Sequence, residues 1–413
     1  MAKVLVLSTV DEKHAGLAWS TSEKLRDRGH EVCFISMDKR YESTSNYFYD
    51  IRTRRTRLKP ISFIHHSLDK FIIKYILKPI NKYSFMSSYL FGIAAHKILD
   101  KCPFNPDYIV VSWVANFITP RTVSKLHQKT GARIIFPMVD EAILSTCHYP
   151  CNCQQFTTGC SNCPAIKRLK WLPRYIHKQK LKYWSSLPAD IIGTSFDLEL
   201  VRKTPFLRHM NLHKTCSYPR NIPIFSRSES RNYFKIPKED FVIFAGANNV
   251  KDERKGFIYL KEALHEFIRL KKNKLKRITL LLIGNGLSDS DFDYGENINV
   301  LIKDFLPKSH FFKAYYACDV YISPTIADSG PMMVNFAIAC GRPVICFPIG
   351  VALDLVVPGK TGYIARITDS KDIAEGIEMF YNMDMSQMLV IEKNCKKHIR
   401  SFEKLDPYGE IIS

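Results

Sequence analysis

The stretch SPTIADSGPMMVNFAIACGRPVICFPIGVALDLVVPGKTGYIA, residues 323–365, decides the fold. It predicts a strand that ends at Ser323, a loop that carries Asp328 and Gly330, and a helix that begins near Pro331. The unpaired amides at such a helix N-terminus favour phosphate groups or sugar hydroxyls. For any single Gly or Asp here, ordinary turn and cap chemistry is the better explanation. The ordered array as a whole instead indicates a ligand site at the carboxyl ends of parallel strands.

Short apolar runs that alternate with helix-like segments continue this pattern along the whole chain. The runs occupy residues 3–9, 32–36, 107–114, 132–138, 190–195, 241–247, 278–284, 298–302, 319–324 and 343–348. Near-continuous Val, Ile and Leu runs indicate strands buried on both faces, and alternation with helices indicates parallel sheets. One sheet of ten or more strands would be unusually large, so the sequence predicts two doubly wound α/β sheets.

The domain boundary is predicted where this periodicity stops. Residues 216–232 are rich in Pro, Ser and Arg and show no apolar period. We therefore expect a first domain at 1–217, a second at 218–385, and a C-terminal helical segment at 386–413 that packs back towards the first domain.

Charge and composition narrow the function classes. The 413 residues carry a net charge of +20, and the first 200 residues hold 29 basic and 16 acidic side chains. Such an excess suits an anionic partner: nucleic acid, a phospholipid surface or a phosphorylated substrate. No apolar stretch reaches the roughly 18–20 residues that span a bilayer, and the start does not read as a signal peptide. The expected compartment is therefore the reducing cytoplasm, where twelve cysteines favour thiols or metal ligands over disulfides.

Two blocks of sequence resemble the retaining nucleotide-sugar glycosyltransferases of family 4, which have the GT-B fold. In the first block, SPT, Asp328, AIACGRPV and GKTGY fit the family pattern. The second, FVIFAGANNVKDERKGFIYLKEAL at 241–264, looks like the first strand and loop of the family's donor domain, and IGNG at 283–286 matches another of its glycine turns. The resemblance covers 218–385 well and the first half loosely. It implies two Rossmann-like domains that face a central cleft, with the acceptor domain first and the nucleotide-sugar domain second.

The resemblance also implies roles for individual residues. Lys255 would hold the donor diphosphate, and Arg254 beside it would supply the charge of a family arginine that is Ala247 here. Asp328 would orient the hydroxyls of the transferred sugar. A solvated charge pair in a loop is the alternative for Arg254 and Lys255. The implied donor-binding residues are Gly246, Arg254, Lys255, Gly284, Ser323, Asp328, Gly330, Pro331, Met332, Met333 and Asn335.

Two residues of the first half carry weaker resemblances. Asp140 ends a strand that would face the same cleft near the acceptor, although a capping Asp is an equally good explanation. Gly16 is all that remains of a glycine pair that family members use for the acceptor.

Phe336 is a departure from the family pattern. It occupies the position of a second family carboxylate that holds the nucleotide ribose, and phenylalanine accepts no hydrogen bond. Loss of such a charge-assisted bond is worth about 1.5–3 kcal/mol. Either Asn335 replaces the carboxylate, or the donor is recognised differently, or the chain is a non-catalytic subunit.

A cysteine-rich segment, TCHYPCNCQQFTTGCSNCPAIKR at 146–168, looks like an insert of glycosyltransferases that build extracellular polysaccharides. Four thiolates in a short loop can surround a structural Zn²⁺, although only the final C-x-x-C is a standard half-site. Unliganded thiols or a redox pair are the alternatives. The predicted ligands are Cys147, Cys153, Cys160 and Cys163, with Cys151 as an extra thiol.

Two basic clusters complete the list of candidates. One spans 52–59, and the other comprises Lys167, Arg168, Lys170, Arg174, Lys178, Lys180 and Lys182, interleaved with aromatic residues. This composition suits an anionic membrane surface, a nucleic-acid backbone or a plain solvated face.

Together with the charge pattern, the resemblance implies a cytoplasmic retaining glycosyltransferase, peripheral on the inner membrane. It would move a sugar from a nucleotide sugar to a lipid-linked glycan in surface-polysaccharide synthesis, with no metal required for the chemistry. The alternatives are a non-catalytic GT-B subunit, a nucleic-acid-binding protein supported by charge alone, and a sugar epimerase of the same fold.

Overall fold

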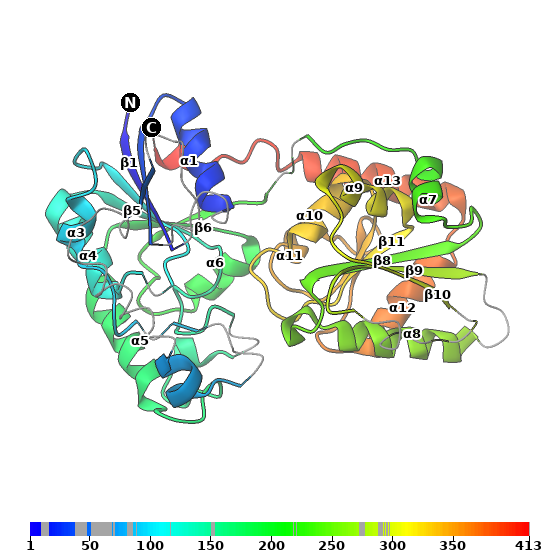
Figure 1. Cartoon of the computed structure of the whole chain (residues 1–413), viewed down its shortest axis with the longest axis horizontal. Coiled ribbons are helices and arrows are strands. Elements are labelled where there is room, and N and C mark those ends of the chain that lie inside the picture. Colours follow the sequence, from blue (N-terminus) through cyan, green and yellow to red (C-terminus); the bar gives the residue numbers. More distant parts are fainter. Residues whose placement is uncertain are drawn as a thin grey trace. The chain divides into compact units, whose positions relative to one another are not determined.

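Figure 1 shows a computed structural model of the chain. It describes residues 1–9, 16–37, 48–50, 68, 71–80, 86–87, 89–115, 117–149, 153–217, 219, 221–271, 277–287, 292, 294, 296 and 298–412. The chain divides into two compact units, one of Met1–Thr215 with Asp406–Ser413 and one of Cys216–Leu405. Each unit is described by itself.

The first unit is built on a parallel sheet of seven strands in the order β3-β2-β1-β4-β5-β6-β7. The strands are β1 (Lys3–Ser8), β2 (Glu31–Ser36), β3 (Phe48–Asp50), β4 (Tyr108–Val111), β5 (Arg133–Pro137), β6 (Ala189–Gly193) and β7 (Asn211–Lys214). The strand order reverses between β1 and β4, and ligands of such sheets bind beyond the carboxyl ends at this switch point.

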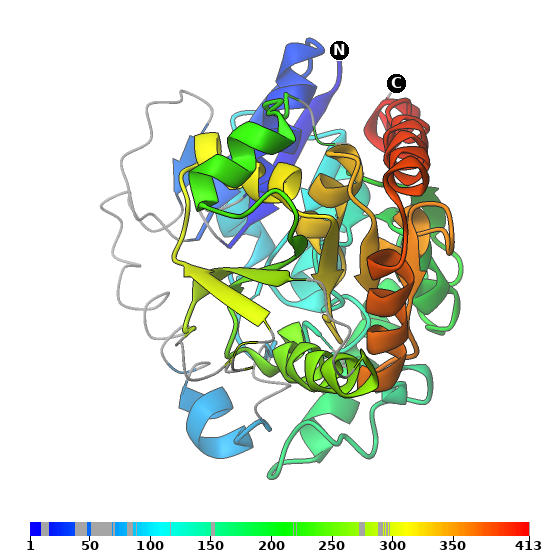
Figure 2. The same ribbon diagram turned by 90° about the vertical axis from the view of Figure 1, so that its right-hand side faces the viewer.

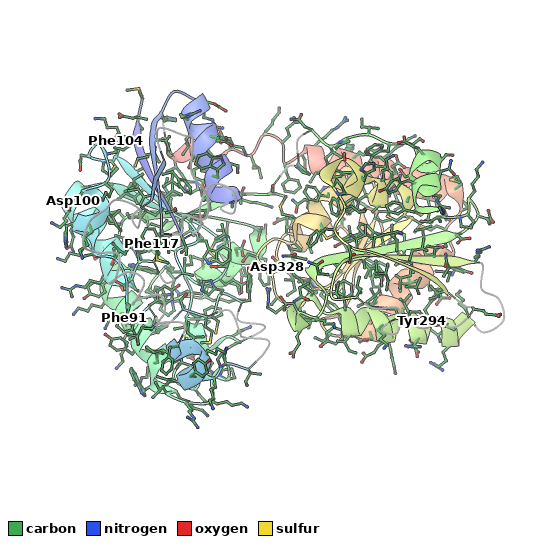
Figure 3. The ribbon with its side chains drawn as sticks, in the orientation of Figure 1. Phe91, Asp100, Phe104, Phe117, Tyr294 and Asp328 are labelled. Atoms are coloured by element: carbon green, nitrogen blue, oxygen red, sulfur yellow. The ribbon has the colours of Figure 1, made fainter. Side chains whose placement is uncertain are left out.

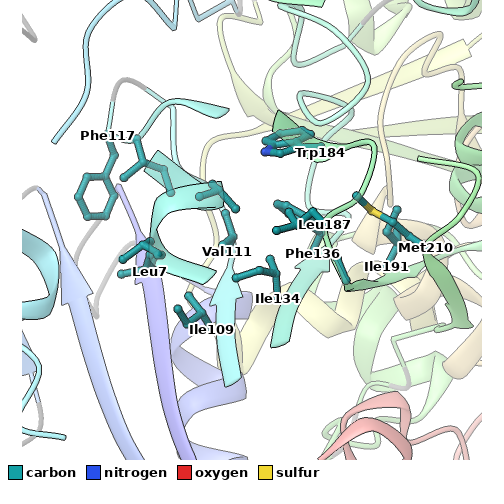
Figure 4. Packing of buried hydrophobic residues seen from close by; sticks show 14 of the residues in the cluster. Leu7, Ile109, Val111, Phe117, Ile134, Phe136, Trp184, Leu187, Ile191 and Met210 are labelled. Atoms are coloured by element: carbon teal, nitrogen blue, oxygen red, sulfur yellow. The ribbon is translucent and has the colours of Figure 1, made fainter. Parts of the chain in front are cut away.

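Helices cover both faces of this sheet. They are α1 (Leu17–Asp27), η1 (Ile72–Leu77), α3 (Ala95–Leu99), α4 (Pro120–Thr130), η3 (Gln155–Thr157), α5 (Trp171–Trp184), α6 (Ser195–Arg202) and α14 (Pro407–Ile411). Alternate strand residues feed two cores, as a pleated strand requires. Leu5 and Leu7 pack with the cluster of Figure 4, whereas Val4 and Val6 pack with α1 and the chain end at Ile411.

The second unit has a parallel sheet of six strands in the order β10-β9-β8-β11-β12-β13. The strands are β8 (Phe241–Asn249), β9 (Ile278–Asn285), β10 (Ile298–Lys303), β11 (Val320–Ser323), β12 (Val344–Cys346) and β13 (Gly362–Ile364). Here the switch point lies between β8 and β11, which pair through Val320 with Ile243 and Tyr321 with Phe244.

Eight helices belong to the described part of this unit. They are α7 (Arg227–Phe234), η4 (Glu253–Lys255), α8 (Phe257–Lys271), α9 (Lys308–Ala317), α10 (Met332–Ala339), α11 (Ala352–Leu355), α12 (Ser370–Tyr381) and α13 (Met385–Arg400). Helices α8 and α12 lie together on one face of the sheet, and α7, α9, α10 and α13 lie on the other (Figure 1).

The predicted α/β class with two doubly wound sheets is confirmed, and every predicted apolar run contains a strand. The short edge strands β3, β7 and β13 escaped sequence analysis because they carry too few apolar residues to form a run. Helix α13 belongs to the second unit, and the chain re-enters the first unit at Asp406. In the part of the chain that the structure describes, no helix combines the length and hydropathy needed to cross a bilayer.

Candidate functional site

The loops that follow β8 and β11 bring two predicted residues together at the switch point of the second unit. Lys255 Nζ donates to Asp328 Oδ2 at 2.6 Å, across 73 residues of sequence. Both side chains are partly exposed, at 23% for Lys255 and 17% for Asp328. Ion pairs with this much exposure contribute about 0–1 kcal/mol to folding, so stability alone does not account for the arrangement. A compact ammonium at the end of a parallel sheet is suited to a phosphate group. Asp328 is labelled in Figure 3.

Arg254 holds these two loops against each other. Its guanidinium donates to Asp252 Oδ2 at 2.6 Å and to the Ala327 carbonyl at 3.4 Å, and its own carbonyl accepts from the Ile326 amide at 2.8 Å. The residue is only 6% exposed. The structure therefore gives Arg254 a positioning contact beside Asp328, and its predicted contact with phosphate stays a prediction.

Glycines permit the close approach of neighbouring loops at two points. Gly256 has φ of +66°, and a Cβ there would lie 1.9 Å from the Pro324 carbonyl oxygen. Gly284 has φ of +148°, and a Cβ there would lie 1.9 Å from the Ala247 carbonyl oxygen. Side chains at either position would push the loops apart, which explains the Lys-Gly pair and the glycine turn in the sequence.

The remaining predicted donor residues surround the Asp328 loop. Ser323 is the buried last residue of β11, and Pro331 is the N-cap of α10. Gly330 donates its amide to Asp328 Oδ1 at 3.1 Å, which orients the carboxylate towards Lys255. Met332 is exposed at this end of the helix.

Gly246 and Met333 lie close to each other in the same region. A Cβ on Gly246 would lie 3.0 Å from Met333 Cε and 2.8 Å from the Ile283 carbonyl oxygen. The small residue thus leaves room for the start of α10 beside the end of β8.

Asn335, the predicted replacement for the missing carboxylate, is buried and hydrogen-bonded within the second unit, and its role towards the donor stays a prediction. Its side-chain amide donates to the Ser217 carbonyl at 2.6 Å, and the residue is 1% exposed. Phe336 packs against aromatic rings of α9, with its centroid 5.2 Å from Phe312 and 6.2 Å from Phe311. Both side chains are thus engaged in packing within the second unit.

Ser329 is a candidate that sequence reasoning missed. It follows Asp328 directly, is 3% exposed, and its hydroxyl has no hydrogen-bond partner among the described residues. A buried hydroxyl without a partner costs free energy, so a ligand oxygen near the start of α10 would satisfy it. A Ser between an Asp and a Gly looks like a turn residue, and for that reason the sequence did not single it out.

A second candidate region lies in the first unit, at the carboxyl ends of β4 and β5. A small hollow of about 30 Å³ occurs there. Its lining is mostly apolar and aromatic, and Figure 4 shows Val111, Phe136 and Trp184 in the cluster behind it. Trp113, two residues after the end of β4, is 41% exposed. The lining also includes the polar side chains of Ser112, Thr119, Asp140 and His148.

Asp140 and His148 belong to a buried hydrogen-bonded chain. His148 Nδ1 lies 2.5 Å from Asp140 Oδ2, and His148 Nε2 lies 2.8 Å from Ser87 Oγ. Asp140 Oδ1 also accepts the Ala142 amide at 2.9 Å. Both carboxylate oxygens are therefore bound within their own loop. Asp140 fixes the imidazole that lines the hollow, and its predicted contact with sugar stays a prediction.

Lys180 is hydrogen-bonded to the backbone of the loop that carries Asp140 and His148. The side chain is 0% exposed, and Nζ donates to the carbonyls of Ala142 and of Ser145. The ammonium also lies 4.8 Å from the Tyr89 ring and 5.4 Å from the Trp184 ring. Burial lowers the pKa of Lys180 to about 7. Sequence analysis had placed Lys180 in a basic surface cluster; the structure removes it from that surface.

Gly16 is the N-cap of α1, with φ of +43°. The preceding residues, 10–15, lie outside the described residues, as do the basic cluster at 52–59 and Cys151. The acceptor role of Gly16 stays a prediction.

The four predicted metal ligands share one neighbourhood. Cys147 and Cys163 are buried in one hydrophobic cluster, and Cys153 packs against it. Cys160 is buried in the larger cluster beside the sheet. A hydrogen bond from the Cys147 thiol lowers the pKa of Cys163 to about 7. Among the residues with described positions, no three His, Cys, Asp or Glu side chains are gathered at metal-holding spacing. The zinc site stays a prediction, which metal analysis of the purified chain would test.

Comparison with known proteins finds a family profile that matches part of the second unit. Residues 239–383 match the family profile described as glycosyl transferases group 1. The chain is also 30% identical over 178 residues to the capsular polysaccharide biosynthesis glycosyltransferase CapM of Staphylococcus aureus. That match covers 41% of this chain and 44% of CapM, so the chain spans less than half of the relative it matches.

Solved structures show the fold of the whole chain. Sucrose-phosphate synthase from Thermosynechococcus elongatus aligns with a TM-score of 0.66 at 15% identity, over 100% of this chain and 96% of that one. Anabaena Alr3699/HepE in complex with UDP and glucose aligns with a TM-score of 0.57 at 14% identity, over 99% and 97%. These likenesses confirm the predicted GT-B fold.

Proposed function

We propose that this chain is a retaining glycosyltransferase that moves a sugar from a nucleoside-diphosphate sugar to a lipid-linked glycan in surface-polysaccharide synthesis. The observation that carries the proposal is the ion pair of Lys255 with Asp328 at the switch point of the second unit. It lies within the region that matches the glycosyl transferases group 1 profile. CapM is named for capsular polysaccharide biosynthesis, and HepE was solved with UDP and with UDP-glucose, which supports this class of donor and product.

The proposed step transfers one glycosyl group. The bond between the anomeric carbon and the diphosphate oxygen breaks, and a bond from an acceptor hydroxyl oxygen forms on the same face of that carbon. The negative charge that grows on the leaving diphosphate is stabilised by the Lys255 ammonium. The acceptor proton passes to the leaving phosphate, so the step needs no separate base. Asp328, released from Lys255 when the diphosphate binds, accepts hydrogen bonds from the sugar hydroxyls.

The hollow in the first unit is the proposed place for the acceptor. An apolar and aromatic lining with a few oriented polar groups is typical of a small-ligand site. The Trp113 ring face can cover the apolar side of a sugar ring. Asp140 and Ser87 hold the His148 ring in one orientation beside it.

The test is ligand-observed NMR of the purified chain with UDP-, GDP- and TDP-sugars, each measured also with Lys255→Ala. A matched control is Lys238→Ala, which removes an exposed lysine at the opposite, amino end of β8. We expect saturation transfer to one donor in the wild type and in the control, and its loss in Lys255→Ala. Equal signals in all three proteins would contradict the proposed role of Lys255.

A non-catalytic subunit is the second candidate, and Phe336 is the observation that favours it. The ring packs among the aromatic side chains of α9, where family members would carry a carboxylate. Absence of binding by every donor, from protein whose folding is verified by circular dichroism, would favour this candidate over an enzyme.

A further inference from the structure

Helix α5 presents an exposed face that is aromatic, aliphatic and basic throughout. The exposed residues recur at the spacing of one helical face: Trp171, Arg174, Tyr175, Lys178, Leu181 and Lys182. Trp171 is 56% exposed and Tyr175 is 42% exposed, with ring centroids 6.2 Å apart. The opposite face is buried and carries Lys180 and Trp184.

The end of the short helix η1 is hydrogen-bonded to the segment that precedes α5. The Lys167 amide donates to the Leu77 carbonyl at 3.2 Å, and the Ile80 amide donates to the Ala165 carbonyl at 3.0 Å. Both segments share one hydrophobic cluster, and both lie at the lower end of the first unit in Figures 1 and 2. On η1, Phe71 is 51% exposed and Tyr75 is 53% exposed.

We call the combined surface of residues 71–80 and 167–182 the basic-aromatic face. Its exposed cations are Lys74, Lys78, Lys167, Arg168, Lys170, Arg174, Lys178 and Lys182. Neither segment contains an Asp or Glu. An ordinary solvated face mixes both signs of charge, and four large exposed rings on it would be costly to leave in water.

We propose that the basic-aromatic face docks on the surface of a bilayer that contains anionic phospholipids. Trp and Tyr rings are suited to the headgroup layer, and each Lys or Arg near an anionic leaflet contributes about 1 kcal/mol of attraction. No described helix is able to span the bilayer, so the attachment is peripheral. A nucleic acid would also attract the cations, but the rings lie in the same face as aliphatic Leu181 and Ile80, which favours lipid over bases.

Helix α5 connects this face to the hollow of the first unit. Trp184 lines the hollow, and Lys180 binds the loop that carries Asp140 and His148. A chain that rests on the bilayer through α5 would meet a lipid-linked acceptor near the surface where that acceptor resides. The purpose of docking rests on the proposed function, whereas the docking itself rests only on the face.

The experiment is cosedimentation of the whole chain with vesicles of phosphatidylcholine, with and without phosphatidylglycerol, in the absence of donor and acceptor. We expect binding to the anionic vesicles that weakens as salt is raised. The triple variant K167A/R174A/K178A should weaken it by roughly 100-fold, since three charges at about 1 kcal/mol each are removed. The variant W171A/Y175A should also weaken binding to the anionic vesicles. The matched control K393A/K397A removes two exposed lysines of α13 and should bind as the wild type does.

Three outcomes would overturn the proposal. They are absence of binding to anionic vesicles, equal loss of binding in the α13 control, and salt-sensitive binding to a single-stranded oligonucleotide without binding to vesicles. Circular dichroism verifies that each variant is folded. Donor binding by NMR is scored separately, so vesicle binding without donor binding would refute the proposed function and leave docking intact.

Discussion

The Lys255–Asp328 site of the second unit and the hollow of the first unit are built by the same type of sheet, yet the sequence indicated both residues of the first site and only Asp140 of the second. In the second unit, Lys255 and Asp328 lie six and five residues after the ends of β8 and β11. Parallel strands that neighbour each other at a switch point deliver such residues to one place. In the first unit, Ser87 and His148 come from segments without apolar periodicity. Strand patterns thus locate residues at strand ends and say little about long loops.

The largest expected effect is on turnover by Lys255→Ala. Loss of the cation proposed to stabilise the leaving diphosphate should lower kcat/KM by roughly 100- to 1000-fold, the range for removal of one oriented group in a transition state. Because the ion pair is partly exposed, Tm should stay close to that of the wild type.

Arg254→Ala is the informative contrast. It removes a buried guanidinium that holds two loops, so it should lower Tm as well as turnover. Steady-state kinetics and thermal unfolding of both variants give the comparison. A Tm loss in Lys255→Ala as large as that in Arg254→Ala would show that the lysine is structural.

Arg254 and Lys255 show which features of the site could be predicted from the sequence and which could not. Arg254 and Lys255 are adjacent in sequence, and both were expected at the diphosphate. The sequence does not indicate that the Arg254 side chain is buried whereas that of Lys255 is partly exposed. The same holds for Lys180 in the first unit. Seven cations without an intervening acid predict one exposed basic surface, but Lys180 is buried. The fold itself, which depends on apolar periodicity, was predicted apart from short edge strands.

The next largest effect concerns Phe336→Glu, the substitution that restores the family carboxylate. Its ring is packed among the aromatic side chains of α9, so a carboxylate there should lower the free energy of unfolding by roughly 2–4 kcal/mol. Phe336→Leu, which keeps an apolar side chain, should cost less. Urea denaturation of both variants is the measurement. A stable Phe336→Glu protein that binds donor more tightly would show instead that the ring blocks a functional ribose site.

A smaller effect is expected for Asp140→Ala, which tests whether the hollow of the first unit binds the acceptor and not the donor. The variant leaves His148 Nδ1 and the Ala142 amide without their buried acceptor, so the first unit should lose about 2–3 kcal/mol. Asp140→Asn retains one acceptor oxygen and should lose less. The KM for acceptor should rise in both variants, while donor binding in the second unit is unchanged. A matching loss of donor binding would show that Asp140 acts on the donor directly.

The smallest effect is the pH dependence that Lys180 contributes. Burial lowers its pKa to about 7 in the folded chain, below the ordinary value of 10.5. From about pH 7 to pH 10.5, the unfolded chain therefore holds the extra proton, and the contribution of Lys180 to stability rises with pH. A neutral amine still has two N–H groups for the carbonyls of Ala142 and Ser145, so the loop stays bound after deprotonation. Between pH 6.5 and 8.5, the stability of the wild type relative to Lys180→Met should rise by about 1–2 kcal/mol. Urea denaturation of both proteins at both pH values measures this difference. The nearby thiols titrate in both proteins, so their contribution largely cancels. A difference that stays constant or falls with pH would show that the ammonium remains charged in the folded chain, neutralised by the thiolates around it.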